Sequence, residues 1–166
     1  NFQAMDRRSL PWVGCLLVLA MLQLAAAVPL ANLQKDPTWT DCGQGATTLT
    51  VTNVVVTPSP VKTGANFSLT VECTSAGDIQ KGALTTKVYL AGINVHTETD
   101  ALCSETTCPI SAGGKAKIST TTYMPIVTPP GWYNIKLSGA DQDELPAICA
   151  DIHFSVVVGL DQPPQQ

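Results

Sequence analysis

Apolar and polar side chains alternate with a period of two between residues 66 and 74, and this pattern constrains the fold more than any other feature. Phe67, Leu69, Val71 and Cys73 fall on one side of an extended chain, and polar residues occupy the positions between them. Successive side chains of a β-strand point to opposite faces, so the pattern predicts a strand with one buried face. After residue 27, no stretch shows a sustained helical period of 3.6 residues.

Further stretches have the composition or the alternation of strands, and Gly- and Pro-rich turns separate them. Turns are predicted at 62–64, 76–78, 111–114 and 129–131. Six or seven short strands with such spacing are typical of an antiparallel β-sandwich or barrel in an all-β domain. The other predicted strands are Leu49–Val56, Leu84–Leu90 followed by Ile93–His96, Lys115–Thr120, Trp132–Ser138 and Ala147–Val157.

Length and charge limit the function. The 166 residues fit one domain, the net charge is −4, and only 13% of the residues are charged. The sole arginines are Arg7 and Arg8, so the rest of the chain lacks the side chain best suited to bidentate phosphate contacts. The composition therefore argues against a nucleic-acid or anionic-membrane surface as the main partner.

The first residues resemble a secretory leader. Arg7 and Arg8 follow Met5, an apolar run extends from Leu10 to Leu24, and three alanines end at Ala27. We expect a signal peptide over 5–27 that is cut after Ala27. The alternative is an uncleaved membrane anchor, because the run of low charge continues to residue 33. At the other end, the Pro- and Gln-rich residues 159–166 are expected to be disordered.

Five cysteines follow the predicted leader, which fits an oxidising compartment such as the extracellular space or a vacuolar or lysosomal lumen. An odd number leaves at least one unpaired, and the remaining four can pair in three ways. The short spacing of Cys103 and Cys108 favours a disulfide that closes a small loop. A metal site is less favoured, because no further ligands lie nearby. Asn66-Phe67-Ser68 is a glycosylation sequon, and Asn66 falls on the polar side of its strand.

Candidates for catalysis are few. The two histidines are His96 and His153, and no metal-binding spacing or nucleophile elbow is present. Asp151 and His153 share one face of a predicted strand. The pattern is therefore compatible with a hydrolase triad, although it favours a solvated pair of side chains. The acidic residues at 141, 143 and 144 lack the spacing of a calcium loop and indicate a solvated turn. We therefore expect no enzyme activity, no bound metal and no cofactor.

The inward positions of the predicted strands are Val, Leu, Ile and Ala, with Phe67, Tyr133 and Phe154 as the clear aromatic residues. Two apolar sheet faces can pack into a solid core, or they can separate and hold an apolar ligand. The alternation is the same in both cases, and by itself it favours the solid core.

The order of several short motifs resembles one known family. Asp41-Cys42-Gly43, the Pro58–Gly64 segment, Leu102–Ile110 with its two cysteines, Pro129–Tyr133 and finally Cys149 follow one another as in the MD-2-related lipid-recognition (ML) family. Within that family, the chain is similar to a plant and algal branch related to Niemann–Pick type C2 sterol carriers and to fungal phosphatidylglycerol/phosphatidylinositol transfer proteins. The resemblance covers residues 39–158.

The resemblance implies an immunoglobulin-like β-sandwich of about seven strands with an internal apolar cavity, and disulfides Cys42–Cys149 and Cys103–Cys108. Cys73 then remains without a partner. The implied cavity mouth lies near the bend at 92–95, the Cys103–Cys108 loop and the turn at 129–131. The residues expected to contact lipid are Phe67, Leu69, Val71, Val88, Leu90, Val95, Ile110, Ile118, Tyr133, Ile135, Ile152 and Phe154.

The resemblance also implies a function. We expect a secreted or lumenal protein that holds a sterol or phospholipid between its sheets and exchanges it with membranes through transient contact. We expect it to be a monomer that binds no nucleic acid. The alternative from another class is a lipid-sensing adaptor that binds a protein partner at the cell surface. An exposed apolar patch around the mouth favours that alternative.

Overall fold

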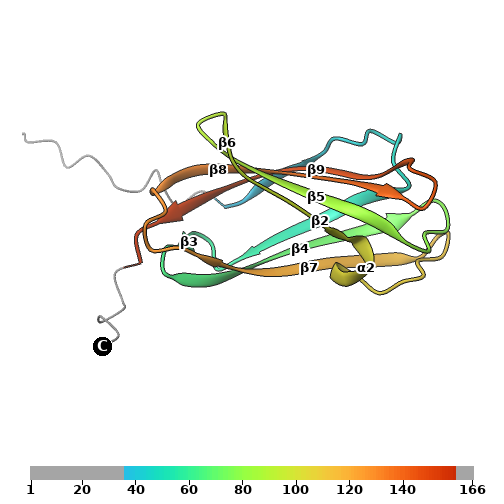
Figure 1. The fold of residues 1–166 in the computed structure, drawn as a ribbon, viewed down its shortest axis with the longest axis horizontal. Coiled ribbons are helices and arrows are strands. Elements are labelled where there is room, and N and C mark those ends of the chain that lie inside the picture. The colour runs from blue at the N-terminus through green and yellow to red at the C-terminus, as the bar shows by residue number, and fades with distance from the viewer. Residues whose placement is uncertain (1–35, 160–166) are drawn as a thin grey trace, which may run out of the picture. The chain divides into compact units, whose positions relative to one another are not determined.

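The protein is an antiparallel β-sandwich, described here by a computed structural model that covers residues 36–159 (Figure 1). One sheet has the strand order β1-β9-β8-β5-β6, with β3 paired to β9, and the other has the order β2-β4-β7. The expected all-β sandwich is confirmed. The described strands are β1 (Thr38–Asp41), β2 (Leu49–Thr57), β3 (Val61–Lys62), β4 (Ala65–Ser75), β5 (Gly82–Leu90), β6 (Ile93–Ala101), β7 (Lys115–Met124), β8 (Gly131–Asp141) and β9 (Pro146–Val157).

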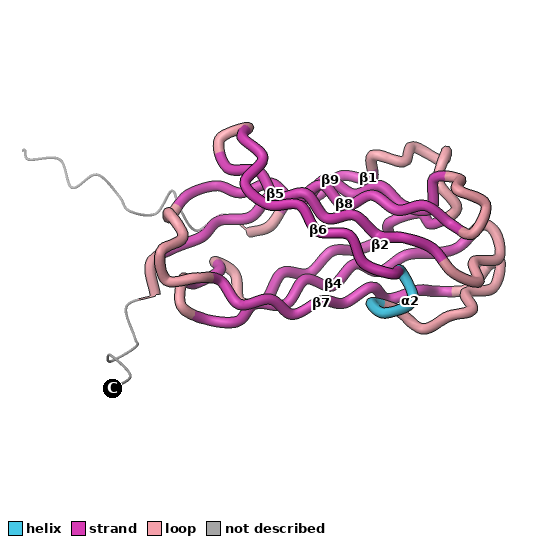
Figure 2. The backbone as a smooth tube through the Cα atoms, viewed as in Figure 1, coloured by secondary structure: helices cyan, strands magenta, loops and turns pink. Residues whose placement is uncertain are grey.

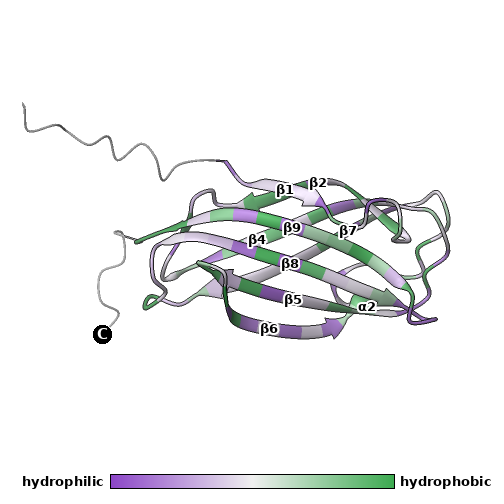
Figure 3. Cartoon of the chain, turned by 90° about the horizontal axis from the view of Figure 1, so that it is seen from above, coloured by the Kyte–Doolittle hydropathy of each residue, from purple (hydrophilic) through white to green (hydrophobic). Residues whose placement is uncertain are grey.

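The strands pair antiparallel except at β3, which runs parallel to β9. The tube in Figure 2 shows the two sheets as two layers, and the short helix α2 (Leu102–Glu105) lies at one end between β6 and β7. Figure 3 views the larger sheet from outside, where β9, β8 and β5 run in front of the smaller sheet.

Strand β4 behaves as its alternation predicts. Phe67, Leu69, Val71 and Cys73 are buried, and β4 is the central strand of the smaller sheet. Asn66, on the opposite face, is exposed and paired with Tyr123 of β7. Burying each large apolar side chain contributes about 1.5–3 kcal/mol, so this register is strongly preferred over a shift by one residue.

The structure has more strand than expected. β6 continues to Ala101, although all nine of its residues are exposed and those after Val95 carry no apolar alternation. β7 continues to Met124, and the short strands β1 and β3 are added. An edge strand needs only the backbone hydrogen bonds of its neighbour, so its side-chain pattern can be polar throughout.

Two disulfides join segments that the resemblance had paired. Cys42 is bonded to Cys149 and so ties the chain after β1 to β9, while Cys103 is bonded to Cys108 around α2. Cys73 is free and buried.

The core is closed at the end of the sandwich that carries α2. Leu102 of the helix is fully buried, and Ile79 and Ile110 are buried and bridged by backbone hydrogen bonds in both directions. Leu84 of β5 is also only 4% exposed. Toward the other end of the same strand, Val88 and Leu90 are only partly buried. The interior is therefore sealed at one end and incompletely filled at the other.

The predicted signal peptide lies outside the described residues, as do residues 160–166 of the predicted tail. Gly159, the first residue of that tail, donates a backbone hydrogen bond to Thr63 Oγ1 at 3.1 Å. Among the described residues, no helix has the length and apolar character needed to cross a membrane.

Candidate functional site

A cavity of about 520 Å³ lies between the two sheets at the incompletely filled end. The smaller sheet contributes β4 and the last residues of β7, and the larger sheet contributes the end of β5, the start of β6, the start of β8 and β9. The connection from β7 to β8 completes the wall. Its lining consists of Phe67, Val88, Leu90, Val95, His96, Thr122, Tyr123, Met124, Pro125, Val127, Thr128, Pro129, Tyr133, Ile135 and Phe154.

Three aromatic rings stack across the cavity from both sheets. The Phe154 ring lies 5.9 Å from the rings of both Phe67 and Tyr133, centroid to centroid, with interplanar angles of 26° and 29°. The Tyr133 hydroxyl donates a hydrogen bond to the carbonyl of Pro129 at 2.9 Å. That bond fixes the β7–β8 connection to β8 and occupies the one phenol of the stack, so the rings offer a ligand mainly apolar surface.

No carboxylate or ammonium group is among the residues that line the cavity. Its titratable side chains are His96, Tyr123 and Tyr133, and burial raises the pKa of Tyr133 above its ordinary value. Tyr133 is therefore neutral at physiological pH. Such a lining suits an uncharged apolar ligand and disfavours a buried ion.

The structure brings most of the predicted contact residues to the cavity. Leu69, Val71 and Ile118 instead line a second, narrower cavity, and Ile110 and Ile152 line neither of the two. Ile152 is fully buried in β9, and Ile110 belongs to the closed end. The seven that line the large cavity are Phe67, Val88, Leu90, Val95, Tyr133, Ile135 and Phe154.

Sequence reasoning missed the residues that β7 and the β7–β8 connection contribute. Met124 has the same strand parity as the predicted inward residues Ala116 and Ile118, so extending the alternation beyond Thr120 would have found it. Val127 and Pro129 lie in a loop, where no periodicity exists to find them.

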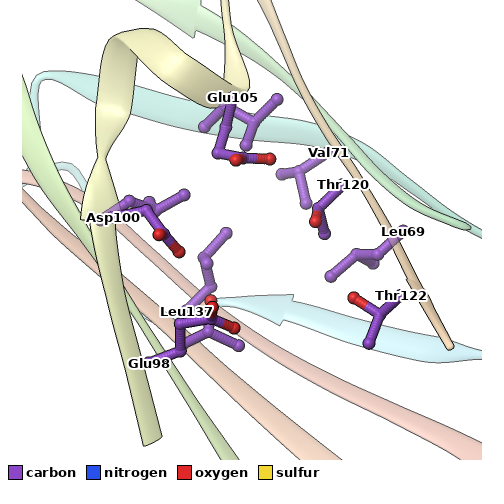
Figure 4. A pocket seen from close by; sticks show the side chains of 11 residues that line it. Leu69, Val71, Glu98, Asp100, Glu105, Thr120, Thr122 and Leu137 are labelled. Atoms are coloured by element: carbon purple, nitrogen blue, oxygen red, sulfur yellow. The ribbon is translucent and has the colours of Figure 1, made fainter. Parts of the chain in front are cut away.

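The narrow cavity, about 50 Å³, lies between the same sheets nearer to α2 (Figure 4). Its inner wall is apolar and includes Leu69 and Val71. Glu98 and Asp100 of β6 and Glu105 of α2 bring three carboxylates to its edge. This edge therefore carries negative charge, whereas the large cavity has an uncharged lining.

Exposed apolar residues border the mouth of the large cavity on two sides. Val95 of β6 and Val127 of the β7–β8 connection line it and are 53% and 85% exposed, and Ile93 and Ile126 beside them are 68% and 70% exposed. We call these four residues the mouth rim. Neither 88–97 nor 118–135 contains Asp, Glu, Lys or Arg.

The mouth does not include the Cys103–Cys108 loop, contrary to expectation. That loop encloses α2, which lies at the end of β6 away from the large cavity, and Glu105 within it contributes to the narrow cavity instead. The bend after β5 and the turn before β8 do lie at the mouth, as the contributions of Val95 and Pro129 indicate.

The candidates for catalysis lie on the outer face of the larger sheet. His153 Nε2 is 3.4 Å from Asp151 Oδ1, and Asn134 of β8 is in hydrogen-bonding distance of both side chains. No serine or cysteine makes a contact with this pair among the described interactions. The acidic loop forms a turn in which Asp141 Oδ1 accepts the backbone N–H groups of Asp143 and Leu145. Within residues 36–159, no cluster of His, Cys, Asp or Glu could hold a metal ion.

The family model described as the ML domain matches residues 36–156, which is most of the chain. This chain belongs to the ML domain family. The fold is also similar to those of solved proteins. It matches a Niemann–Pick type C2 protein from the Japanese carpenter ant with a TM-score of 0.60 at 12% identity, covering 72% of this chain and 99% of that one. It matches chicken MD-1, solved in complex with lipid IVa, with a TM-score of 0.52 at 16% identity, covering 72% and 88%.

Two similar sequences come from lipid-transfer proteins. The chain is 25% identical over 122 residues to a phosphatidylglycerol/phosphatidylinositol transfer protein of Mycosarcoma maydis, covering 69% of this chain and 63% of that protein. It is 28% identical over 140 residues to a putative phosphatidylglycerol/phosphatidylinositol transfer protein of Dictyostelium discoideum, covering 82% and 98%. The ML-domain chain thus spans less than two thirds of the fungal relative and nearly all of the Dictyostelium one.

Proposed function

We propose that this ML-domain protein binds the apolar part of one lipid in the large cavity and transfers that lipid between membranes. The observation that carries the proposal is a cavity of about 520 Å³ between the sheets whose lining holds no carboxylate or ammonium group. This volume is in the usual range for small-molecule sites, roughly 300–1,000 Å³. The names of the similar proteins support a phospholipid, and the resemblance to Niemann–Pick type C2 sterol carriers makes a sterol the other candidate.

The energetics suit a carrier. Burying about 400 Å² of lipid surface is worth roughly 10 kcal/mol before the cost of association. Lost motional freedom offsets a large part of that gain, so the net affinity is moderate. A moderate affinity lets the protein extract a lipid from one membrane and release it into another, with no covalent step required.

The charge distribution sets the direction in which the lipid enters. Glu98, Asp100 and Glu105 make the edge of the narrow cavity negative, which repels an anionic headgroup. The mouth rim is uncharged. A phospholipid therefore places its tail between Val88 and the stacked rings, with its headgroup at the rim in contact with water.

The mouth rim supports transient contact with a membrane. Ile93, Val95, Ile126 and Val127 can enter the apolar boundary of a bilayer without desolvating a formal charge. The same rim favours the alternative, an adaptor that binds a protein partner through it. The two disulfides fit a secreted or lumenal location.

The test is lipid loading of the protein purified after expression of the full chain in eukaryotic cells. Native mass spectrometry and lipid extraction should find one co-purified lipid per chain, and a fluorescent phospholipid or sterol should exchange with it. Val88→Trp should reduce loading about tenfold, because the indole fills space that the ligand needs.

Val55→Trp is the matched control, since Val55 is 44% exposed on β2 and lines neither cavity. It should load lipid as the unmodified protein does. Equal loading of both variants would overturn the placement of the ligand in the large cavity. The adaptor alternative predicts lipid loading without transfer between vesicles.

A further inference from the structure

A third hollow lies on the outer face of the larger sheet, on the opposite side of that sheet from the large cavity. It encloses about 470 Å³ and is built by Tyr89 of β5, Trp132, Asn134 and Lys136 of β8, and Asp151 and His153 of β9. We call this the outer groove. From this residue set, we propose that the outer groove binds a polyhydroxylated ring, a sugar or an inositol, stacked on Trp132.

Strand register brings these side chains together. Residues 132, 134 and 136 share one face of β8 because they are two apart, and Asn134 is paired with Tyr89 on one side and with His153 on the other. Lys136 is paired with Asp151 in the next row. The groove therefore lies on three adjacent hydrogen-bonded strands, which hold its polar groups in fixed relative positions.

The turn after β5 forms one wall. Ala91 and Gly92 have φ values of 50° and 81°, and both contribute to the groove. Two consecutive residues with positive φ make a tight turn of the kind that closes a hairpin. Figures 1 and 2 show this hairpin end bending away from the sandwich, and Figure 3 shows no other labelled strand in front of β8 and β9.

The aromatic side chains differ in availability. Trp132 is 40% exposed, so its ring can accept a ligand. The Tyr89 ring already faces the Lys136 ammonium, whose Nζ is 5.7 Å from the ring centroid. The groove therefore offers one free aromatic surface, and this matches the C–H face of a single ring better than a cage for an organic cation.

The polar groups present donors and acceptors close to that surface. Asn134 contacts the carboxylate of Asp151, and its amide nitrogen lies 3.2 Å from His153 Nε2. The side chains of Asp151 and His153 are 29% and 54% exposed, so they keep capacity for a further partner. Vicinal hydroxyl groups both donate and accept hydrogen bonds. They can therefore pair with a carboxylate, which accepts, with an ammonium, which donates, and with an amide or an imidazole, which can do both.

The charges argue against other ligands. Lys136 is the one cation of the groove and Asp151 its one carboxylate, so a phosphate or a nucleic acid would meet a charge of its own sign. A bilayer surface would have to desolvate both charges. A neutral polyol meets neither penalty.

The test uses free ligands, namely myo-inositol and the methyl glycosides of mannose, glucose, galactose and N-acetylglucosamine. Titration of the ¹⁵N-labelled protein should shift the Trp132 indole signal and backbone signals of β8 and β9 for at least one of them. Trp132→Ala should weaken that binding about tenfold, and His153→Leu should weaken it while keeping the stacking surface.

Val55→Ala is the matched control, because Val55 is an apolar residue 44% exposed on the other sheet that lines neither cavity nor the outer groove, and it should bind as the unmodified protein does. Thermal melting should show that all variants are folded. The proposal is overturned if no probe shifts these signals, if the shifts persist in Trp132→Ala, or if only a protein partner binds the groove.

The ring that binds the outer groove could belong to a lipid headgroup or to a soluble glycan, and two further measurements distinguish these sources. If the ring belongs to a lipid headgroup, phosphatidylinositol in vesicles should shift the groove signals in the unmodified protein and fail to do so in Val88→Trp. If it belongs to a soluble glycan, Val88→Trp should bind the free ring unchanged and vesicles should add nothing. Either result supports the groove. The titration with free ligands tests it independently of whether the large cavity carries a lipid, whereas the headgroup outcome rests on the proposed function.

Discussion

Cys73 shows how one buried residue acquires a chemical character from its surroundings. It is 1% exposed on β4, and burial, with a smaller contribution from the charge of Asp41, raises the pKa of its thiol from 9.0 to about 12. Both effects disfavour the thiolate, the form that reacts. Cys73 is therefore a packed apolar side chain and no nucleophile.

We predict that the thiol of Cys73 is unreactive in the folded protein. Among residues 36–159, Ellman's reagent at pH 8 should label no cysteine under native conditions and one in guanidinium chloride, because the other four described cysteines are in disulfides. Rapid native labelling would contradict the burial. Cys73→Ser should lower the free energy of unfolding by about 1–3 kcal/mol, since it buries a hydroxyl, and Cys73→Ala should cost less than that.

The same shift predicts a stability change at high pH. Because the pKa of Cys73 is higher in the folded than in the unfolded chain, the unfolded state loses this proton first. The contribution is constant below pH 9, decreases as pH rises above 9, and is lost near 12. Urea denaturation of the unmodified protein and of Cys73→Ala at pH 8 and 10.5 should show a smaller decrease for the variant.

At the scale of elements, the two disulfides constrain very different lengths of chain. Cys42 and Cys149 are 107 residues apart, and Cys103 and Cys108 only 5. The chain-entropy model assigns about 4–5 kcal/mol to the long loop and about 2 kcal/mol to the short one. The long disulfide also holds β1 against β9, where a four-residue strand has few hydrogen bonds of its own.

We therefore predict that removing the long disulfide destabilises the domain more. The double substitution of Cys42 and Cys149 by alanine should lower the melting temperature substantially further than the same change at Cys103 and Cys108. Differential scanning calorimetry measures both. Equal losses would show that strain or residual structure in the unfolded chain outweighs loop length.

Elements also differ in how far their sequences reveal them. β4 alternates strictly, and its inward residues were predicted correctly because the strand buries one face. β9 departs from strict alternation, since Ala147 and Ser155 are buried as well. β6 was predicted only as far as His96, since its later residues are exposed and mostly polar. The alternation of β8 places Asn134 and Lys136 on one face, but the outer groove also depends on neighbours in β5 and β9 and on the turn after β5.

At the scale of the molecule, one end of the sandwich is filled and the other is open, and the exposed apolar residues of the rim gather at the open end. If the rim docks on membranes, a charge there should impair exchange without changing what the cavity holds. Ile126→Asp should slow lipid transfer between vesicles about tenfold and leave lipid loading unchanged, because Ile126 belongs to the mouth rim but does not line the cavity.

Leu145→Asp is the control for that substitution. Leu145 is 58% exposed in the turn between β8 and β9, at the end of β8 opposite the mouth. It should transfer lipid at the unmodified rate, measured by fluorescence dequenching of a labelled phospholipid. Equal slowing by both variants would contradict docking through the rim.

The sequence alone determined which residues face inward, because strand periodicity and apolar burial are local and need no knowledge of the partner sheet. It could not determine whether the two inward faces touch. Leu84, Val88 and Leu90 share one face of β5, yet Leu84 lines only the narrow cavity near α2 and the other two line the large cavity. Only the tertiary structure decides this, since the separation of the sheets depends on how the loops, the helix and the stacked rings at each end fill the space between them.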